Sequence, residues 1–362
     1  MGADLGRSER GVTPTVHLVA SGGGHLELLN AVRGAFAGCR RVWVVDAPRA
    51  DRLRHQGERV HALPQYDRHP LRGKLLQNAA LSLALVLRER PKLVISSGAG
   101  GTVPFSCFAR LLGAKLVFIE TMARVTAPSA SGRVLSRLAS DVLVQWPEAV
   151  GAYPGARLCR PALLEAVRPG EPSPGRGTFV AVGTHTQPFD RLLRLVDRAA
   201  ADGLLPRPIV AQVGASSYRP RSCRARVRMS PDEVELAMHR SRYVICHAGS
   251  GLVSAALRAG RRPLVLPRLF VHGEHFNDHQ EELAEKLGGL GAVVRLFDRI
   301  RQAELDQAGA PLPELAIDGT PSVGETLAAI LRETLGSTTL PSPPSAEGSG
   351  GLELAHQGGG DG

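Results

Sequence analysis

Short apolar runs alternate with longer amphipathic stretches along most of the chain. In the first half the apolar runs cover residues 16–20, 41–46, 92–97, 115–120 and 141–146. Stretches of helical periodicity separate them, among them residues 26–36 and 75–90. Continuous apolar runs of this length are typical of strands in a parallel sheet, because crossover helices bury both faces of such a sheet. The pattern therefore predicts an α/β unit.

The same alternation restarts after residues 169–177, PGEPSPGRG, whose three prolines and three glycines predict a linker. The later apolar runs cover residues 178–183, 208–214, 242–249, 263–268 and 291–296. They predict a second α/β unit with its own parallel sheet. Residues 336–362 are of low complexity and are predicted to be disordered.

The overall composition agrees with two ordinary globular domains. The 362 residues are 43% hydrophobic and 22% charged. The net charge of +10 favours partners that carry negative charge, such as phosphates, nucleic acid or an anionic membrane. Nearly all of the positive charge is arginine, which points partly to a compositional bias of the genome. The arginine-rich run at 219–228 has no interleaved aromatic residues, so a solvated loop and edge strand is preferred to a nucleic-acid groove.

The cysteines and the N-terminal region indicate a cytoplasmic protein. The five cysteines are far apart and form no CxxC pair, which fits a reducing compartment. The first apolar run leads straight into a glycine turn and is predicted to be a buried strand, not a signal peptide. No stretch reaches the roughly 18 apolar residues that span a bilayer. The longest, residues 79–87, is a core helix or a helix at a membrane interface.

Two glycine-rich turns follow predicted strands of the first half, where ligands bind in open parallel sheets. Ser21-Gly22-Gly23-Gly24-His25 precedes a predicted helix, so its backbone amides and the helix N-terminus could hold an anion. His25 is a candidate general base, since its side chain titrates near neutrality, or else a capping or packing histidine. The second turn contains Gly98 and Gly100, and it is either a ligand loop or a tight strand-to-helix connection.

A carboxylate and an arginine follow another strand of the first half. Glu120 ends the predicted strand, and Arg124 lies four residues later. This spacing suggests an ion pair at the ligand edge, with a structural or a functional role.

Polar residues also follow three predicted strands of the second half. Hydrogen-bonding groups at these places suit a diphosphate and a hydroxyl-rich sugar. The candidates are Gly183, Thr184, His185, His247, Gly249, Ser250, Gly251, Pro267, Glu274, His275, Asn277, Asp278, His279 and Gln280. A metal site formed by His272, His275, His279 and Asp278 is the alternative. The zinc-binding motif HExxH is absent, however, and Gly273 opposes a helix there. No metal and no cofactor are therefore predicted.

These motifs resemble known glycosyltransferases in both halves. Residues 182–193, 244–268 and 273–287 are similar to the catalytic subunit of Alg13/Alg14 glycosyltransferases and to the C-terminal domain of family 28 glycosyltransferases. Residues 21–29, 94–105, 118–132 and 144–156 resemble the Alg14-type subunit, which recruits its partner to the membrane and binds the acceptor. The motifs are most similar to those of the bacterial exopolysaccharide glycosyltransferase subunits PssD and PssE, here fused in one chain.

The resemblance implies the GT-B fold, in which two Rossmann-like domains face a cleft. It implies an Alg14-like acceptor domain at 1–168, a linker at 169–177, a nucleotide-sugar domain at 178–335 and a tail at 336–362. The implied reaction is inverting transfer from a UDP-sugar to a polyprenyl-diphosphate-linked saccharide, at the inner face of the cell membrane and beside other polysaccharide-assembly enzymes. His25 would be the base, with Glu120 and Arg124 beside it, and the glycine turn at 249–251 would meet the diphosphate.

Several departures leave alternatives open. The family usually has a ribose-binding glutamate where this chain has Ala255, which leaves a catalytically impaired scaffold as an alternative. The loop at residues 247–251 reads HAGSG, whereas the bacterial relatives often have a second glycine and a proline there. Alg14 proteins commonly carry an N-terminal membrane anchor. A UDP-sugar epimerase shares the architecture. Asp46 lies where a dinucleotide-binding enzyme carries an acidic residue, but the GxGxxG spacing is missing.

Overall fold

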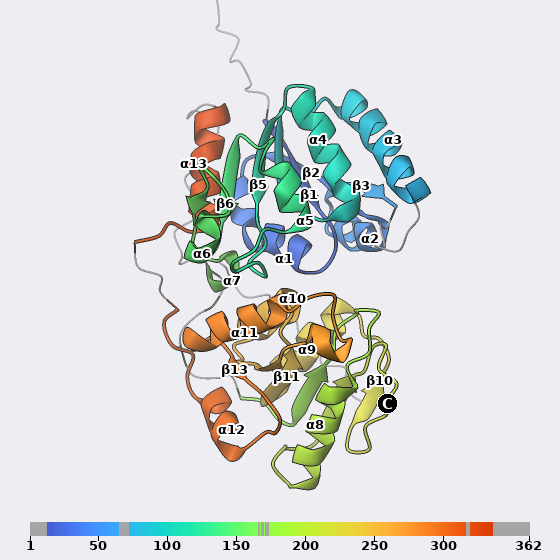
Figure 1. Cartoon of the computed structure of the whole chain (residues 1–362), viewed down its shortest axis with the longest axis vertical. Coiled ribbons are helices and arrows are strands. Elements are labelled where there is room, and N and C mark those ends of the chain that lie inside the picture. The colour runs from blue at the N-terminus through green and yellow to red at the C-terminus, as the bar shows by residue number, and fades with distance from the viewer. Residues whose placement is uncertain are drawn as a thin grey trace, which may run out of the picture.

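The computed structural model describes residues 13–64, 72–165, 167, 170, 174–315 and 319–335, which form two α/β lobes (Figure 1). The predicted disordered tail at 336–362 and part of the predicted linker lie outside the described residues. Each lobe is built around one parallel sheet, as the alternation of apolar runs predicted.

The first lobe contains a seven-stranded sheet in the order β3-β2-β1-β4-β5-β6-β7, with every neighbouring pair parallel. Its strands are β1 (Thr15–Ala20), β2 (Arg40–Asp46), β3 (Arg59–Leu63), β4 (Leu93–Gly98), β5 (Lys115–Ile119), β6 (Asp141–Val144) and β7 (Arg157–Leu158). Its helices are α1 (Gly24–Ala31), η1 (Arg33–Phe36), α2 (Ala47–His55), α3 (Arg72–Glu89), η2 (Gly100–Thr102), α4 (Val103–Leu111), α5 (Ala130–Leu135), α6 (Pro147–Val150) and α7 (Ala162–Glu165). The edge strands β3 and β7 are not among the predicted strands, because they are short and only partly apolar.

The second lobe contains a six-stranded parallel sheet in the order β10-β9-β8-β11-β12-β13. Its strands are β8 (Thr178–Ala181), β9 (Ile209–Gln212), β10 (Arg224–Arg226), β11 (Tyr243–His247), β12 (Leu264–Leu266) and β13 (Val294–Arg295). Its helices are α8 (Asp190–Ala201), α9 (Pro231–Arg240), α10 (Ser250–Arg258), η3 (Phe270–His272), α11 (His279–Gly289) and α12 (Gln302–Gly309). The arginine-rich run supplies β10, an exposed edge strand, as predicted.

The central strands of the first lobe are buried on both faces, which explains why their sequences are almost entirely apolar. Val16 and Leu18 of β1 pack with Phe36 of η1 on one face. Val19 packs with Phe105 of α4 on the other face. Alternate residues of one strand therefore enter different cores, as the two-residue period of a strand requires.

The last helix belongs to the first lobe, so the second domain does not extend to residue 335 as predicted. Helix α13 (Val323–Leu335) lies beside the first lobe and not the second (Figure 1). Its residues Val323, Leu327, Ile330 and Leu331 are fully buried in the core that contains β1 and η1. An amphipathic pattern predicts that a helix buries one face, but it does not say which sheet receives that face.

The lobes touch where the carboxyl ends of both sets of strands converge. Arg258 of α10 forms an ion pair of 3.2 Å with Glu27 of α1. Thr126 donates a hydrogen bond of 3.1 Å to Glu282 of α11. The loops predicted to bind ligands in the two halves therefore meet at one junction between the lobes.

Candidate functional site

Two glycine turns predicted from the sequence face each other across this junction. A methyl group added to Gly24 would collide with Oγ of Ser250, so the first turns of α1 and α10 are in close contact. Gly23 has φ of +74°, a left-handed backbone that glycine adopts without strain. Both helices direct the positive ends of their dipoles at the junction, and such ends bind phosphate groups.

His25 lies in the first turn of α1 with a defined proton position. Its Nδ1 is 2.7 Å from the carbonyl oxygen of Ser97. Because a carbonyl only accepts hydrogen bonds, Nδ1 carries the proton and Nε2 keeps its lone pair in the neutral ring. Burial lowers the pKa of His25 below 6.5, more than the Ser97 carbonyl and Glu120 raise it. The ring is therefore neutral at pH 7 and can accept a proton.

The predicted ion pair between Glu120 and Arg124 is absent. The Glu120 carboxylate is buried and accepts hydrogen bonds from the backbone amides of Thr121 and Ser129 and from the hydroxyl of Tyr153. These donors fold the loop after β5 around the carboxylate. Glu120 therefore stabilises a loop. The spacing between Glu120 and Arg124 could not reveal this role, because Ser129 and Tyr153 lie further along the chain.

Arg124 lies between the two lobes. Its positive charge lowers the pKa of His25 in the first lobe and that of His275 in the second. Among the described residues, its guanidinium group has no hydrogen bond or ion pair. It is therefore a cation at the junction that remains available to an anionic ligand.

His247 occupies a cradle formed by two glycines of the second lobe. A methyl group at either Gly183 or Gly249 would collide with the His247 ring. Burial and the nearby Arg268 lower the pKa of His247 to about 3, so the ring is neutral. A hydrogen bond with the backbone of Ala181 acts in the opposite sense on this pKa. Gly249 and Gly183 are thus needed to seat this histidine beside the start of α10.

Two histidines of the second lobe contact Asn277, and a third lies beside one of them. The Asn277 side-chain oxygen lies within hydrogen-bond distance of Nδ1 of both His275 and His279. The rings of His185 and His275 have centroids 5.0 Å apart. The described residues contain no group of three or more His, Cys, Asp or Glu side chains arranged to hold a metal ion. Gly273, with φ of +66°, ends η3 before α11 begins, so the histidines do not share one helix.

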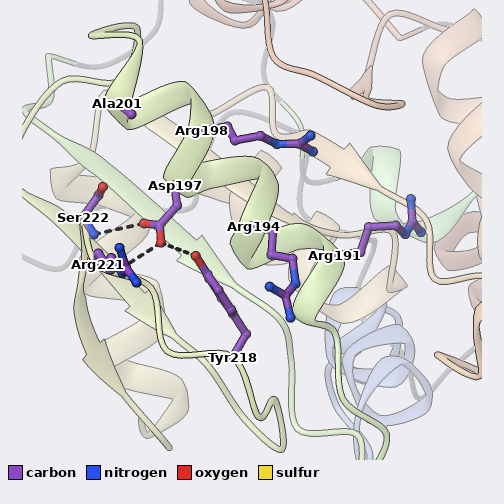
Figure 2. Close-up of a pocket in the computed structure, with 8 residues that line it drawn as sticks. All are labelled: Arg191, Arg194, Asp197, Arg198, Ala201, Tyr218, Arg221 and Ser222. Atoms are coloured by element: carbon purple, nitrogen blue, oxygen red, sulfur yellow. Dashed lines mark hydrogen bonds between the residues drawn. The ribbon is translucent and has the colours of Figure 1, made fainter.

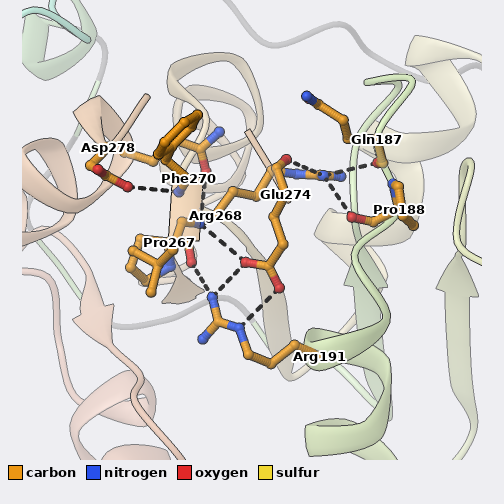
Figure 3. Close-up of polar contacts among 10 residues, drawn as sticks. Gln187, Pro188, Arg191, Pro267, Arg268, Phe270, Glu274 and Asp278 are labelled. Carbon is orange, nitrogen blue, oxygen red and sulfur yellow. Dashed lines mark hydrogen bonds and ion pairs between the residues drawn. The ribbon is translucent and has the colours of Figure 1, made fainter. Parts of the chain in front are cut away.

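A buried arginine that the sequence analysis did not select organises this loop. Arg268 is 1% exposed and donates to the carbonyl oxygens of Val182, Gln187, Pro188 and Glu274, at 2.8 to 3.3 Å (Figure 3). These carbonyls belong to the loop after β8 and the loop after β12. Burial lowers the pKa of Arg268 to about 10, so it stays charged at neutral pH. One guanidinium group therefore joins the two loops.

Three polar residues predicted to bind sugar instead stabilise this loop. Glu274 accepts two hydrogen bonds from Arg191, at 3.0 and 2.8 Å (Figure 3). Asp278 accepts from the backbone amide of Phe270, and Gln280 accepts from that of Arg268. Arg191 also donates to the carbonyl oxygen of Pro267. The polar pattern of the sequence does not separate side chains that fold the loop from those that face the junction.

The remaining predicted residues lie at the same carboxyl edges with differing roles. Gly98 has φ of +81° and packs against Ser131 and Phe118, so its lack of a side chain serves local packing. Gly100 and Thr184 are exposed, and Gly22 and Gly251 are part-buried.

A separate groove of about 720 Å³ lies between α8 and the loop that follows β9 (Figure 2). Arg194, Arg198 and Arg221 contribute to its lining, and Asp197 accepts hydrogen bonds from the loop. None of the predicted site residues lines it.

Comparisons with known proteins match both lobes. The family described as "Oligosaccharide biosynthesis protein Alg14 like" matches residues 73–160, and the "Glycosyltransferase family 28 C-terminal domain" matches residues 178–303. The UDP-N-acetylglucosamine transferase subunit ALG14 of Mus musculus is 39% identical over 79 residues, which are 20% of this chain and 36% of that protein.

Longer matches span both lobes. The UDP-N-acetylglucosamine--N-acetylmuramyl-(pentapeptide) pyrophosphoryl-undecaprenol N-acetylglucosamine transferase of Ralstonia nicotianae is 32% identical over 276 residues, covering 70% of this chain and 67% of that enzyme. The enzyme of the same name from Nitrosospira multiformis is 27% identical over 314 residues, covering 78% and 85%.

Solved structures show the same fold. MurG of Acinetobacter baumannii has a TM-score of 0.53 at 18% identity, covering 88% of this chain and 99% of that one. The UDP-GlcNAc 2-epimerase of Methanocaldococcus jannaschii has a TM-score of 0.58 at 9% identity, covering 89% and 99%. The GT-B prediction is confirmed, and the sequence relatives favour a transferase over an epimerase. The chain belongs to the family 28 glycosyltransferases with an Alg14-like first lobe, and it is a UDP-sugar glycosyltransferase.

Proposed function

We propose that this enzyme transfers N-acetylglucosamine from UDP-N-acetylglucosamine to a polyprenyl-diphosphate-linked saccharide, with inversion, during synthesis of a cell-envelope or exopolysaccharide glycan. The printed names of its relatives support this donor and this class of acceptor. The observation that carries the proposal is the contact between the α1 and α10 N-termini. Two facing positive helix ends suit a reaction in which donor and acceptor each bring a diphosphate.

The second lobe holds the donor in this proposal. Backbone amides at Gly249, Ser250 and Gly251 bind its diphosphate, and the cluster of His185, His275 and His279 faces the nucleotide or sugar. The start of α10 and the free guanidinium of Arg124 supply positive charge for the departing UDP. No metal or other cofactor is required by this arrangement.

The first lobe supplies the base. The acceptor hydroxyl oxygen forms the new bond to the anomeric carbon while the bond from that carbon to the UDP oxygen breaks, and UDP keeps the electron pair. Nε2 of His25 takes the hydroxyl proton, because Nδ1 already donates to Ser97. One displacement of this kind inverts the anomeric configuration.

A substrate screen tests the function. Purified protein is incubated with UDP-N-acetylglucosamine, UDP-glucose, UDP-galactose or UDP-glucuronic acid and an undecaprenyl-diphosphate-linked saccharide. We expect transfer from UDP-N-acetylglucosamine, measured as radiolabel in the lipid fraction. Retention of UDP without any transfer would favour the scaffold alternative, and an altered free UDP-sugar would favour the epimerase.

Changing His25 to Ala tests the base. We expect turnover to fall by roughly 10² or more, with UDP affinity unchanged in a calorimetric titration. In the unaltered enzyme the acid limb of kcat/KM lies below pH 6.5, because burial lowers the pKa of His25 and the base works only above that pKa. His55→Ala, at an exposed histidine of α2, is the control. Near-normal turnover in His25→Ala removes His25 from the mechanism.

Changing Arg268 to Lys tests the donor loop. Lysine keeps the charge but lacks the planar fork that reaches four carbonyl oxygens. We expect KM for the UDP-sugar to rise about tenfold or more, since each buried carbonyl left without a donor costs about 1–3 kcal/mol. Arg262→Lys is a matched control, because Arg262 also donates to carbonyl oxygens but near α12. Equal KM values for the two variants contradict the positioning role.

We also propose that the enzyme is cytoplasmic and works at the inner face of the cell membrane. Helix α3 turns polar residues inward, since Asn78 and Ser82 are fully buried. Its outer face carries Leu76, Leu83 and Leu87, which are 70%, 38% and 55% exposed. An apolar face turned to the outside suits insertion into a lipid interface. Within the described residues, no helix has the length and apolar character needed to cross a membrane.

A double substitution tests this surface. Leu76→Glu with Leu87→Glu should weaken binding to phosphatidylglycerol-containing vesicles at least tenfold in a flotation assay, since burying one leucine contributes about 1.5–3 kcal/mol. Leu236→Glu, at an exposed leucine of α9 in the second lobe, is the control. Unchanged flotation of the double variant contradicts the proposed membrane surface.

A further inference from the structure

Asp46 is the last residue of β2. It is also the N-cap residue of α2, because it comes directly before the first helical residue. An aspartate there usually accepts a hydrogen bond from a backbone amide of the first helical turn. Asp46 makes no such bond. Its Oδ1 is buried and has no hydrogen-bond partner among the described residues. The side chain is therefore not used to cap its own helix.

A buried carboxylate oxygen without a donor is unfavourable, because it has lost its hydration without a replacement. Buried polar atoms in proteins nearly always have a partner, and an orphan often marks a place where a ligand supplies one. The residue as a whole is part-buried, so Asp46 lies at the edge of the packed interior. A hydroxyl group is the simplest donor that would complete it.

The register of the sheet places Asp46 beside the glycine turn. Ala20 at the end of β1 lies next to Val45, so Asp46 follows the same edge as Ser21. The negative charge of Asp46 also raises the pKa of His25, in the same sense as Glu120 and opposite to Arg124. Since the Glu120 carboxylate already has three donors, Asp46 is the acid near His25 that retains capacity to accept hydrogen bonds.

We propose that Asp46 binds a hydroxyl group of the acceptor saccharide and positions that sugar for proton removal by His25. The proposal rests on the proposed function and names the acceptor subsite within it. Neighbouring hydroxyls of a sugar can donate to the two oxygens of one carboxylate. Its negative charge also favours the imidazolium that His25 becomes when it takes the proton. Asp46 thus contacts substrate, and the donor remains in the second lobe.

Asp46→Asn and Asp46→Ala test the subsite. We expect KM for the lipid-linked acceptor to rise about tenfold or more in both variants, since a hydrogen bond to a charged group is lost. KM for the UDP-sugar should stay within about twofold. Asp51→Asn is the matched control, because Asp51 lies on α2, is 80% exposed and pairs with Arg54.

A second readout tests the effect of the Asp46 charge on His25. Asp46→Asn keeps the shape but removes a charge that raises the pKa of His25, so the acid limb of the rate profile should move to lower pH. Circular dichroism and the melting temperature establish that both variants are folded.

The outcomes also distinguish this inference from the proposed function. An unaltered enzyme that transfers sugar, with Asp46 variants of normal acceptor KM and an unmoved acid limb, overturns the role of Asp46 alone. If the unaltered enzyme transfers no sugar to any lipid-linked acceptor, the proposed function fails. Slow hydrolysis of the UDP-sugar then still reports the acid limb, and an unmoved limb in Asp46→Asn overturns the inference about Asp46 as well.

Discussion

The close approach of two helix N-termini is the constraint on which the site depends. Helices α1 and α10 come from different lobes, and the absence of a side chain at Gly24 lets their first turns meet at Ser250. Two like-signed helix ends repel each other weakly, and an anion between them removes that repulsion. Arg124 lies close enough to His25 of the first lobe and His275 of the second to lower the pKa of each.

Buried charged side chains of the second lobe stabilise its loops as well as contributing to the binding site. Arg268 satisfies four carbonyl oxygens, and Glu274 is held by Arg191. A buried charge is tolerated only when hydrogen bonds replace its lost hydration, and Arg268 meets that condition with partners from two loops. The loops around His185 and His275 are thereby fixed before any ligand arrives, which reduces the entropy lost on binding.

The sequence predicted the architecture well because buried parallel strands and glycine turns have strong local patterns. It located His25, Gly249 and the loop around Asn277 at the carboxyl edges, where the structure brings them together. It could not assign Glu120 or Glu274, because their partners lie far away in the chain. Arg268 resembled any arginine after a strand, and only three-dimensional packing distinguishes a guanidinium group that organises loops.

The position of α13 has a consequence for how the lobes are connected. Because this helix completes a core of the first lobe, the polypeptide passes between the lobes twice, and the second lobe is inserted into the first. Cleavage within residues 169–177 would separate the halves in sequence but leave them tethered by the second passage. A version made as two independent chains would therefore need another element to cover the apolar surface that α13 occupies here.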